Sequence, residues 1–403
     1  MTYYVDGASG SDANDGRSDA RPRRTLSQLN LQSVTVLLRR GTTIEMRTSV
    51  FPVNLVLDAY GSGAKPILSV PTGATAGIVP STGEIVVRNV VFRGNPADMS
   101  SNSAVGGGKA SRVVVEDCEF DYFANAVTFS GANGVIQRNR ISNMSNNGLY
   151  GGKWGYPAPS NYLISENVID ATGTANDAIT LHDGDGIGEG NRILNNRLWG
   201  ARENAVDVLG QFRATTIQGN TIGSNGLAGI IVSRNTGSAT GGEGTIIADN
   251  VFTGSSNTAI YARVNGATIT RNRIANLSST SLASAIAVSG PADITDNTIS
   301  VTSASTRPVI TLIQTAGLPS PTGTILRNSI DNGSSQQLFG VIVASDTADQ
   351  LVSRWNIDQN AYRVNTSNVG WFFGLSLSAW RSRNWGGSFP FKDQGAQMTV
   401  VNQ

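Results

Sequence analysis

The stretches "GVIQRNRISN" (134–143) and "ATITRNRIAN" (267–276) repeat one pattern in distant parts of the chain. Both contain I-x-x-N-x-I, in which apolar residues flank an Asn at fixed positions. A search for internal repeats is the first step with such a sequence, and it finds this pattern along most of the chain. With Val, Leu or Phe also allowed at the apolar positions, the central residues are Asn89, Asn139, Asn167, Asn196, Asn220, Asn250, Asn272, Asn297 and Asn328.

The spacing between copies is irregular, and this favours strands over helices. Consecutive copies start at Ile136 and Ile164, but also at Ile247 and Ile269. Helical-pair repeats keep a near-constant length, because two helices must be closed in each repeat. A coil of short strands can lengthen one corner loop without disturbing the others. Two degenerate copies fit the same frame, Val115-Cys118-Phe120 and Val352-Trp355-Ile357.

The repeat predicts stacked coils whose strands form parallel sheets, with neighbouring strands about 4.8 Å apart. The apolar residues beside each Asn would fill the interior. Asn suits a tight corner because it tolerates the left-handed backbone conformation. Its amide could also bond to the Asn of the next coil, as in the ladders of cross-β structures.

This pattern resembles the right-handed parallel β-helix proteins, the pectate-lyase-like superfamily, over residues from about 34 to 365. The resemblance implies an all-β fold, a single-stranded right-handed parallel β-helix. The opening is similar to that of bacterial and phage members, which implies an N-terminal strand, loop and cap helix in 1–33, the helix at 24–30. Residues 366–403, which include "SLSAWRSRN" (376–384), would form a C-terminal capping tail. Early strands are expected at 34–38, 54–58 and 66–70.

Composition excludes some classes of function. The formal net charge is +1 and charged residues make up 15% of the chain, which gives no support for a nucleic-acid binder driven by bulk charge. No apolar run approaches the length of a membrane span. The start "MTYYVDGASG" lacks the features of a signal peptide, so we expect an extracellular protein of which this is the mature form, or one that leaves its cell by another route, such as on a virus particle. Cys118 is the only cysteine and is expected to be a buried apolar residue.

A second strand can be aligned in each coil, and it places polar side chains in a row. Its second and fourth positions are almost all apolar and should point inward, so the third and fifth should point outward. We call these third- and fifth-position side chains the candidate row. The middle coils offer Tyr150, His182, Asp207, Tyr261 and Arg263 there. The aligned strands are 126–130, 148–152, 178–182, 205–209, 229–233, 259–263 and 285–289.

His182 and Asp207 are the candidates for proton transfer in this row. His182 is the only histidine of the chain, and an imidazole with a pKa near neutrality can pass protons. Asp207 interrupts an apolar strand and could act as a general acid or base. The alternative for His182 is a structural or merely exposed side chain. The alternative for Asp207 is an exposed residue paired with Arg202 or Arg213.

The loops that follow these strands add further candidates, because rigid scaffolds often present functional residues on loops. Lys153, Trp154, Tyr156 and Arg234 lie there. Arg matches carboxylates with its planar fork, and exposed aromatic rings stack on sugars. Simple loop packing is the alternative for the two aromatic residues.

A weak metal signal comes from Asp177, Asp183 and Asp185 in a Gly-rich stretch. Ca²⁺ prefers several oxygen ligands in flexible loops, which makes it the candidate cofactor. The spacing does not match an EF-hand, and a solvated acidic turn is the alternative. The acidic loop "DGASGSDANDG" (6–16) is expected to be a structural turn.

The family resemblance implies a polysaccharide-active enzyme, and a lyase that cleaves an acidic, uronate-containing polysaccharide by β-elimination is the first hypothesis. Arg213 or Arg263 would neutralise the uronate carboxylate, His182 or Lys153 would be the base, and Tyr150 or Tyr261 the acid. Trp154, Tyr156, Arg234, Tyr261 and Arg263 would bind substrate. A uronate epimerase would share the first step.

Two alternatives stay open. A glycoside hydrolase or phage tailspike depolymerase could use the carboxylates of Asp183, Asp185 and Asp207, although the "NTDG" and "GHG" motifs of polygalacturonases are absent. A non-catalytic glycan-binding surface protein is the other. The aromatic-rich tail fits either a cap or a trimer contact, so the sequence leaves monomer or homotrimer undecided.

Overall fold

In the computed structural model, the chain divides into two compact units, residues 1–202 and 203–403. The described residues are 1–99, 103–106, 109–152, 155–173, 176–182, 184–234, 241–254, 257–275, 284–301, 307–315, 320–333, 337–342, 346–365, 377–384 and 392–401.

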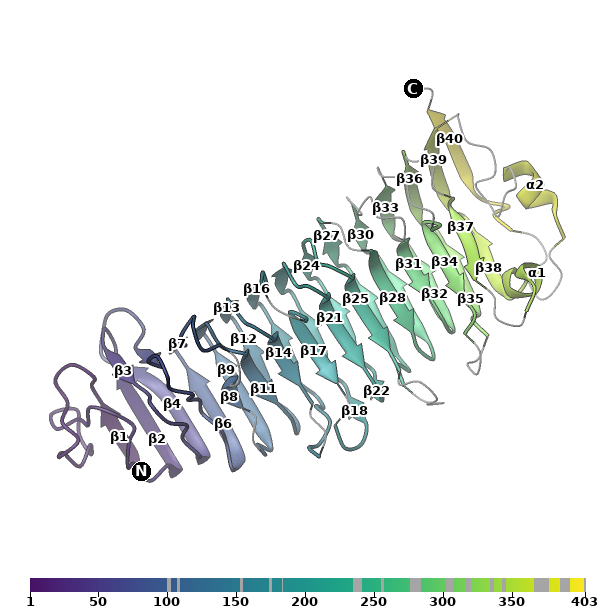
Figure 1. Cartoon of the computed structure of the whole chain (residues 1–403). Helices are drawn as coiled ribbons and strands as arrows, with labels where there is room; N and C mark the ends of the chain where they lie inside the picture. Colours follow the sequence, from purple (N-terminus) through teal and green to yellow (C-terminus); the bar gives the residue numbers. More distant parts are fainter. Residues whose placement is uncertain are drawn as a thin grey trace. The chain divides into compact units, whose positions relative to one another are not determined.

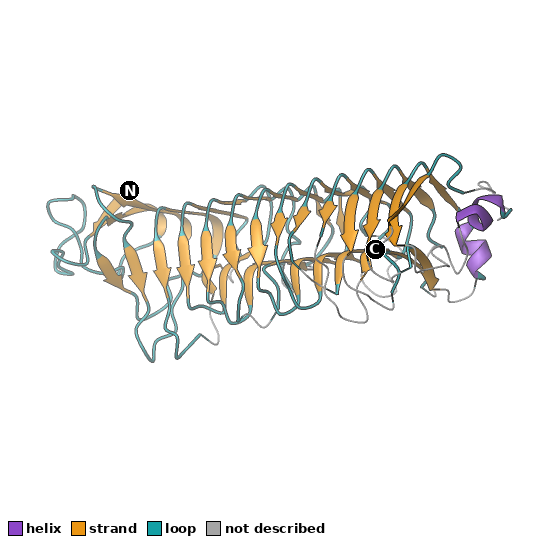
Figure 2. Cartoon of the chain, turned by 90° about the horizontal axis from the view of Figure 1, so that it is seen from above, coloured by secondary structure: helices purple, strands orange, loops and turns teal. Residues whose placement is uncertain are grey.

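Each unit is built from coils whose strands lie in three parallel sheets, here called A, B and C (Figures 1 and 2). The chain runs from a strand of sheet A, through the corner that contains the repeated Asn, to sheet B and then to sheet C. The expected β-helix is therefore confirmed, including the early strands.

In residues 1–202 the strands follow one another in hydrogen-bonded order within each sheet. Sheet A contains β1 (Thr2–Val5), β2 (Gln32–Arg39), β4 (Val53–Tyr60), β6 (Thr82–Arg88), β9 (Arg112–Glu116), β12 (Val135–Gln137), β15 (Leu163–Ser165) and β19 (Arg192–Leu194). Sheet B contains β3 (Thr43–Glu45), β5 (Ile67–Ser69), β7 (Val91–Arg93), β10 (Glu119–Asp121), β13 (Arg140–Ser142), β16 (Val168–Asp170) and β20 (Arg197–Trp199). Sheet C contains β8 (Ser103–Gly106), β11 (Asn125–Phe129), β14 (Asn147–Gly151) and β17 (Ile179–His182), and a loop carries β18 (Gly188–Glu189).

Residues 203–403 repeat the arrangement. Sheet A contains β23 (Thr216–Gln218), β26 (Thr245–Ala248), β29 (Ala267–Thr270), β32 (Ala292–Thr295), β35 (Gly323–Leu326) and β38 (Trp355–Asp358). Sheet B contains β24 (Thr221–Ile222), β27 (Val251–Phe252), β30 (Arg273–Ile274), β33 (Thr298–Val301), β36 (Ser329–Asn332), β39 (Ala361–Asn365) and β40 (Gln397–Val401). Sheet C contains β21 (Asn204–Leu209), β25 (Ala228–Ser233), β28 (Thr258–Arg263), β31 (Ser284–Val288), β34 (Ile310–Ile313) and β37 (Phe339–Ile342). Outside the sheets lie β22 (Phe212–Arg213), α1 (Ala348–Val352) and α2 (Leu377–Ser382).

The interior is filled by the apolar residues of the repeat, stacked coil upon coil. Ile136 pairs with Ile164 in register, and both are fully buried. Phe92 and Phe120 stack with ring centroids 5.1 Å apart. Burying one such side chain contributes about 1.5–3 kcal/mol, so the many repeats add up to a large apolar core.

The Asn residues form continuous hydrogen-bonded columns inside each unit, as predicted. Asn139 donates from its backbone N and its Nδ2 to Oδ1 of Asn167, both at 3.0 Å, and Asn167 bonds to Asn196 in the same way. Each Nδ2 also donates to a main-chain carbonyl, for example Asn139 to Val115 at 2.9 Å. In residues 203–403 the Asn column runs through Asn220, Asn250, Asn272, Asn297, Asn328 and Asn360.

The left-handed corner position, however, belongs to the residue before the Asn in these coils. Arg138, Glu166, Asp249 and Arg327 have φ between 54° and 56°. The Asn itself turns inward, because its amide is needed for the column. The preceding side chain points outward and can pair, as Arg138 does with Asp117 at 2.8 Å.

Two copies of the repeat were predicted in the wrong frame, because neighbouring residues of similar polarity fit the pattern equally well. Near the start, Asn89 takes the left-handed corner with φ 57°, and the buried column position falls to Val90. Near the end, the register pairs Ile325 with Ile357, so Asn360 and not Trp355 continues the column.

The N-terminal cap helix expected at 24–30 is wrong. These residues form bends and a turn. Asp12 holds them by accepting hydrogen bonds from the backbone N of Arg24 and Thr25, which competes with helix formation. Asp6 similarly accepts from the backbone N of Ala8 and Ser9, which supports the reading of this loop as a structural turn.

The described part of the C-terminal tail meets the end of the Asn column. Asp393 accepts hydrogen bonds from Asn360 Nδ2, Tyr362 Oη and Trp380 Nε1, at 2.9–3.1 Å. Burial raises the pKa of Asp393. Trp380 of α2 stacks on Phe339 with centroids 6.3 Å apart. Most other aromatic residues of the tail lie outside the described residues, so a cap over 366–403 stays a prediction.

The described part of the chain holds no helix with the length and apolar character that crossing a bilayer requires.

We expect Cys118 to resist thiol reagents in the folded protein. Its side chain is fully buried, and burial raises the pKa of the thiol to about 12. The thiolate, which is the reactive form, is therefore scarce at neutral pH. An aromatic disulfide reagent at pH 8 should find no reactive thiol in the native protein and one after denaturation; rapid native labelling would contradict this.

Candidate functional site

The candidate row lies on sheet C, and its register within each unit is as predicted. In the first unit Thr128, Tyr150 and Thr180 are successive partners. In the second, Asp207 pairs with Ile231, and Ile231 with Tyr261. Each unit thus brings residues from neighbouring coils side by side.

Burial divides the residues of the row into two groups. Thr128, Ser130, Thr180, Ala287 and Ser289 are buried, although their positions were expected to point outward. Tyr150, His182, Asp207, Tyr261 and Arg263 are half-buried. These five side chains are therefore packed on the sheet and still accessible, which suits contact with a ligand.

In the first unit, Tyr150 and His182 form a packed pair. Their ring centroids are 5.9 Å apart and their planes meet at 72°, an edge-to-face arrangement. Burial raises the pKa of Tyr150, so its hydroxyl stays protonated at neutral pH. The pair places a protonated hydroxyl beside an imidazole.

Asp177 is part of the structure of the same unit. Its carboxylate accepts a hydrogen bond from Thr180 Oγ1 at 2.9 Å, and it is 3% exposed. Asn147 Oδ1 accepts from the backbone N of Asp177 and from Thr180 Oγ1. This second polar column, beside sheet C, has no counterpart in the repeat pattern and was missed.

The loops of the first unit place Tyr156 beside Asp185. The backbone N of Asp185 donates to the carbonyl of Tyr156 at 2.6 Å, and the N of Ala158 donates back to Asp185. The Asp185 side chain is exposed. Lys153, Trp154 and Asp183 lie outside the described residues, so their predicted roles stay predictions.

The predicted calcium ligands are covered only in part by the described residues, because Asp183 lies outside them. No group of three or more His, Cys, Asp or Glu side chains gathers in the described part of the chain. Asp177 would have to give up its bond to Thr180. Calcium therefore enters no step of the chemistry below.

In the second unit, guanidinium groups gather around one carboxylate. Arg213 lies 3.4 Å from Glu243, whose two oxygens also accept from the backbone N of Gly241 at 3.0 Å. The pKa of Glu243 is lowered, since hydrogen bonds to Gly241 and the charge of Arg213 outweigh its burial. We call Arg213, Arg234, Arg263 and Glu243 the arginine cluster.

Arg234 forms the buried part of this cluster. It is 1% exposed, and its Nη1 donates to Asn265 Oδ1 at 2.7 Å. Burial, followed by the charge of Arg263, lowers the pKa of Arg234. Its backbone N donates to the carbonyl of Arg263. This placement favours a role in supporting Arg263 over direct contact with a ligand.

A cavity of about 270 Å³ opens beside Tyr261, lined also by Asn257, Thr258, Ser284, Ala287, Arg307 and Ile313. Burial raises the pKa of Tyr261, and the charges of Arg263 and Arg307 oppose this shift. Arg307, Asn257 and Ser284 were missed in the sequence. Arg307 and Asn257 precede their sheet C strands in loops of unequal length, and Ser284 is the first residue of β31, one position before the aligned strand 285–289.

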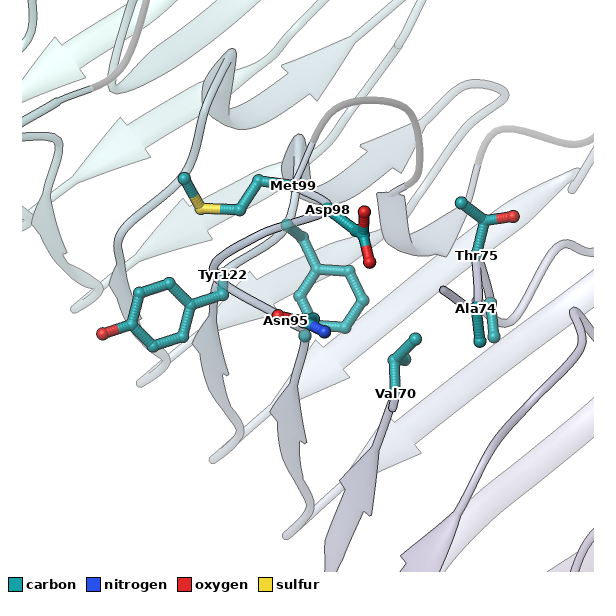
Figure 3. Close-up of a pocket in the computed structure, with 10 residues that line it drawn as sticks. Val70, Ala74, Thr75, Asn95, Asp98, Met99 and Tyr122 are labelled. Atoms are coloured by element: carbon teal, nitrogen blue, oxygen red, sulfur yellow. The ribbon is translucent and has the colours of Figure 1, made fainter. Parts of the chain in front are cut away.

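A hollow near the start of the chain is too small to be a binding site. Val70, Thr75, Asn95, Asp98 and Tyr122 lie around it (Figure 3). Its volume is about 10 Å³. That is barely room for one water molecule.

Comparison with known proteins supports the fold. Residues 72–222 match the family model described as "Right handed beta helix region". No curated protein matches the sequence significantly.

Several solved structures share this architecture. The catalytic domain of a GH87 α-1,3-glucanase, in complex with tetrasaccharides, is similar with a TM-score of 0.57 and 15% identity, over 77% of this chain and 64% of that one. This chain thus spans less than two thirds of the glucanase domain. XylC in complex with xylose has a TM-score of 0.54 and 12% identity, over 99% of this chain and 86% of that one.

The A-module of the mannuronan C-5 epimerase AlgE6 of Azotobacter vinelandii is also similar. Its TM-score is 0.51 at 14% identity, over 92% of this chain and 90% of that one. At such low identities these likenesses establish the right-handed β-helix fold, and function must be argued from the residues of this chain.

Proposed function

We propose that this β-helix protein is a carbohydrate-active enzyme that cleaves a uronate-containing polysaccharide by β-elimination. The observation that carries the proposal is the arginine cluster of the second unit. Among the described residues, the guanidinium groups of Arg213, Arg234 and Arg263 lie there with the carboxylate of Glu243, and Arg263 acts on the half-buried Tyr261. Such an excess of positive charge attracts carboxylates, and the Arg fork fits them in geometry.

The reaction needs a neutralised carboxylate, a base and an acid. Pairing of the uronate carboxylate with Arg213 or Arg263 makes the proton on the adjacent C5 carbon more acidic. The base removes this proton, the bond from C4 to the glycosidic oxygen breaks, and a double bond forms between C4 and C5. The acid gives a proton to the departing oxygen, so atoms and charges balance.

Each unit offers its own candidates for the proton transfers, Tyr150 and His182 in the first unit and Asp207 and Tyr261 in the second. Tyr150 and His182 lie on neighbouring coils with their rings in contact. The raised pKa of Tyr150 suits the role of acid, because the hydroxyl holds its proton until the leaving oxygen needs it. A neutral imidazole at His182 suits the role of base. Tyr261, whose pKa is also raised by burial, is the second candidate acid.

Epimerisation and hydrolysis remain alternatives to the lyase reaction. Likeness to an epimerase acting on mannuronan favours a uronate substrate, and an epimerase would return the proton to the opposite face of C5. Likeness to a glucanase favours hydrolysis, for which Asp207 and the exposed Asp185 supply carboxylates. The proposed location is extracellular, and the oligomeric state, monomer or trimer, is left to direct measurement.

A screen of acidic polysaccharides tests the proposal, each with and without a calcium chelator. A lyase gives products that absorb in the ultraviolet, because the new double bond is conjugated with the carboxylate. A hydrolase gives new reducing ends without that absorbance, and an epimerase incorporates deuterium from heavy water without cleavage. If none of the acidic polysaccharides reacts in any of the three ways, the protein is a non-catalytic glycan binder and the proposal is wrong.

A further inference from the structure

The cavity beside Tyr261 has the chemistry of a sugar subsite. It spans three neighbouring coils, with Tyr261 on β28, Ala287 on β31 and Ile313 on β34. Ala287 and Ile313 give it an apolar side, and Tyr261 adds an aromatic ring. Asn257 and Ser284 supply hydrogen-bonding groups at its other side. A sugar ring needs this combination, since it has apolar faces and a hydroxylated edge.

The lining of the cavity also includes a basic side chain, that of Arg307. The charges of Arg307 and Arg263 both act on the phenol of Tyr261. Arg263 follows Tyr261 on the same strand, and its Nε is buried without a hydrogen-bond partner among the described residues. A buried donor of this kind is stabilised by an anionic acceptor.

The size of the cavity limits what it can hold. Its volume of about 270 Å³ lies just under the range of about 300–1,000 Å³ that is typical of pockets for drug-sized ligands. It therefore has room for one monosaccharide unit and not for a longer segment. The Ser284 hydroxyl is fixed by a 3.0 Å hydrogen bond with Thr311 Oγ1, so this part of the lining is preorganised.

We propose that this cavity is a subsite for a single uronate residue, in which Arg307 binds the carboxylate and Tyr261 stacks on the sugar ring. This inference rests on the proposed function for the identity of the polymer. It adds a specificity residue, Arg307, that the candidate row does not contain.

The test is a titration of the whole chain with galacturonate and mannuronate trisaccharides, followed by calorimetry. The carboxyl-reduced trisaccharides serve as neutral counterparts. We expect at least one acidic trisaccharide to bind more tightly than its neutral form. Arg307→Gln should lower the affinity for that acidic trisaccharide at least tenfold and leave the affinity for the neutral one unchanged. Tyr261→Ala should lower both affinities. Arg307→Lys keeps the charge but not the planar fork, so its affinity for the acidic trisaccharide should lie between those of Arg307→Gln and the unmodified protein.

Arg271→Gln is the matched control, because Arg271 is exposed at a corner of the same unit and pairs with Asp249. Its binding should equal that of the unmodified protein, and the melting temperatures of all variants should agree. Equal affinity of Arg307→Gln and the unmodified protein for the acidic ligand would overturn the subsite. The subsite would also be overturned if the unmodified protein bound the acidic and neutral trisaccharides equally well, or bound neither.

Binding and turnover separate this inference from the proposed function. If Arg307→Gln loses affinity although no polysaccharide is cleaved, the subsite stands and the lyase proposal falls. If a polysaccharide is cleaved with the same KM by Arg307→Gln and the unmodified protein, the lyase proposal stands and the subsite falls.

Discussion

Replacing His182 with Ala is expected to lower turnover of the polysaccharide at least about a hundredfold, the scale of losing acid–base help. The imidazole is half-buried against Tyr150 and is the only one in the chain. The measurement is the initial rate of absorbance increase on the polysaccharide found in the screen.

Three further variants make this prediction specific. Tyr150→Phe keeps the ring contact and removes the hydroxyl, so it should also lower kcat if Tyr150 is the acid. Asp207→Asn should lower turnover about a hundredfold if its carboxylate takes part in proton transfer. Ser142→Ala, on sheet B of the first unit, is the control and should leave the rate unchanged. Unmodified rates in both His182→Ala and Asp207→Asn would place the reacting groups elsewhere.

Replacing Asn297 with Ala is expected to lower the free energy of unfolding by about 3–5 kcal/mol, because several buried hydrogen bonds are lost at once. Asn297 Oδ1 accepts from the backbone N and the Nδ2 of Asn272, at 2.9 and 3.0 Å. Its Nδ2 donates to the Ile269 carbonyl and to Asn328 Oδ1, at 2.9 and 3.0 Å. The variant leaves these partners buried without their bonds. Urea unfolding followed by circular dichroism gives the measurement.

The neighbouring residue provides a matched control. Asp296 occupies the left-handed corner with φ 57° and forms an exposed ion pair with Arg327 at 2.8 Å. Asp296→Asn removes the charge and keeps a residue that tolerates this conformation, so it should change stability little. A loss as large as that of Asn297→Ala would mean that the corner, and not the buried Asn column, provides the stability.

Part of the candidate site could be read from the sequence, because alternation along a strand is a local property. It placed Tyr150 next to the coil of His182, and Tyr261 on the same strand as Arg263. Alternation did not indicate Arg307 and Asn257, which line the cavity from loops, or Ser284 at the start of β31. The path of a loop depends on what it packs against, and its length differs from coil to coil. Nor did alternation reveal that Arg234 is buried and bonded to Asn265.

The sequence by itself determined the coil of stacked parallel strands and the Asn column, because every coil must satisfy the same buried amides and apolar contacts. Only the tertiary structure decided the frame at the ends, where Val90 and Asn360 take the column positions, and the absence of a helix at 24–30. It also decided which row residues stay accessible. The physical reason is that a repeated pattern fixes contacts that recur, whereas ends, loops and cavities depend on contacts that occur once.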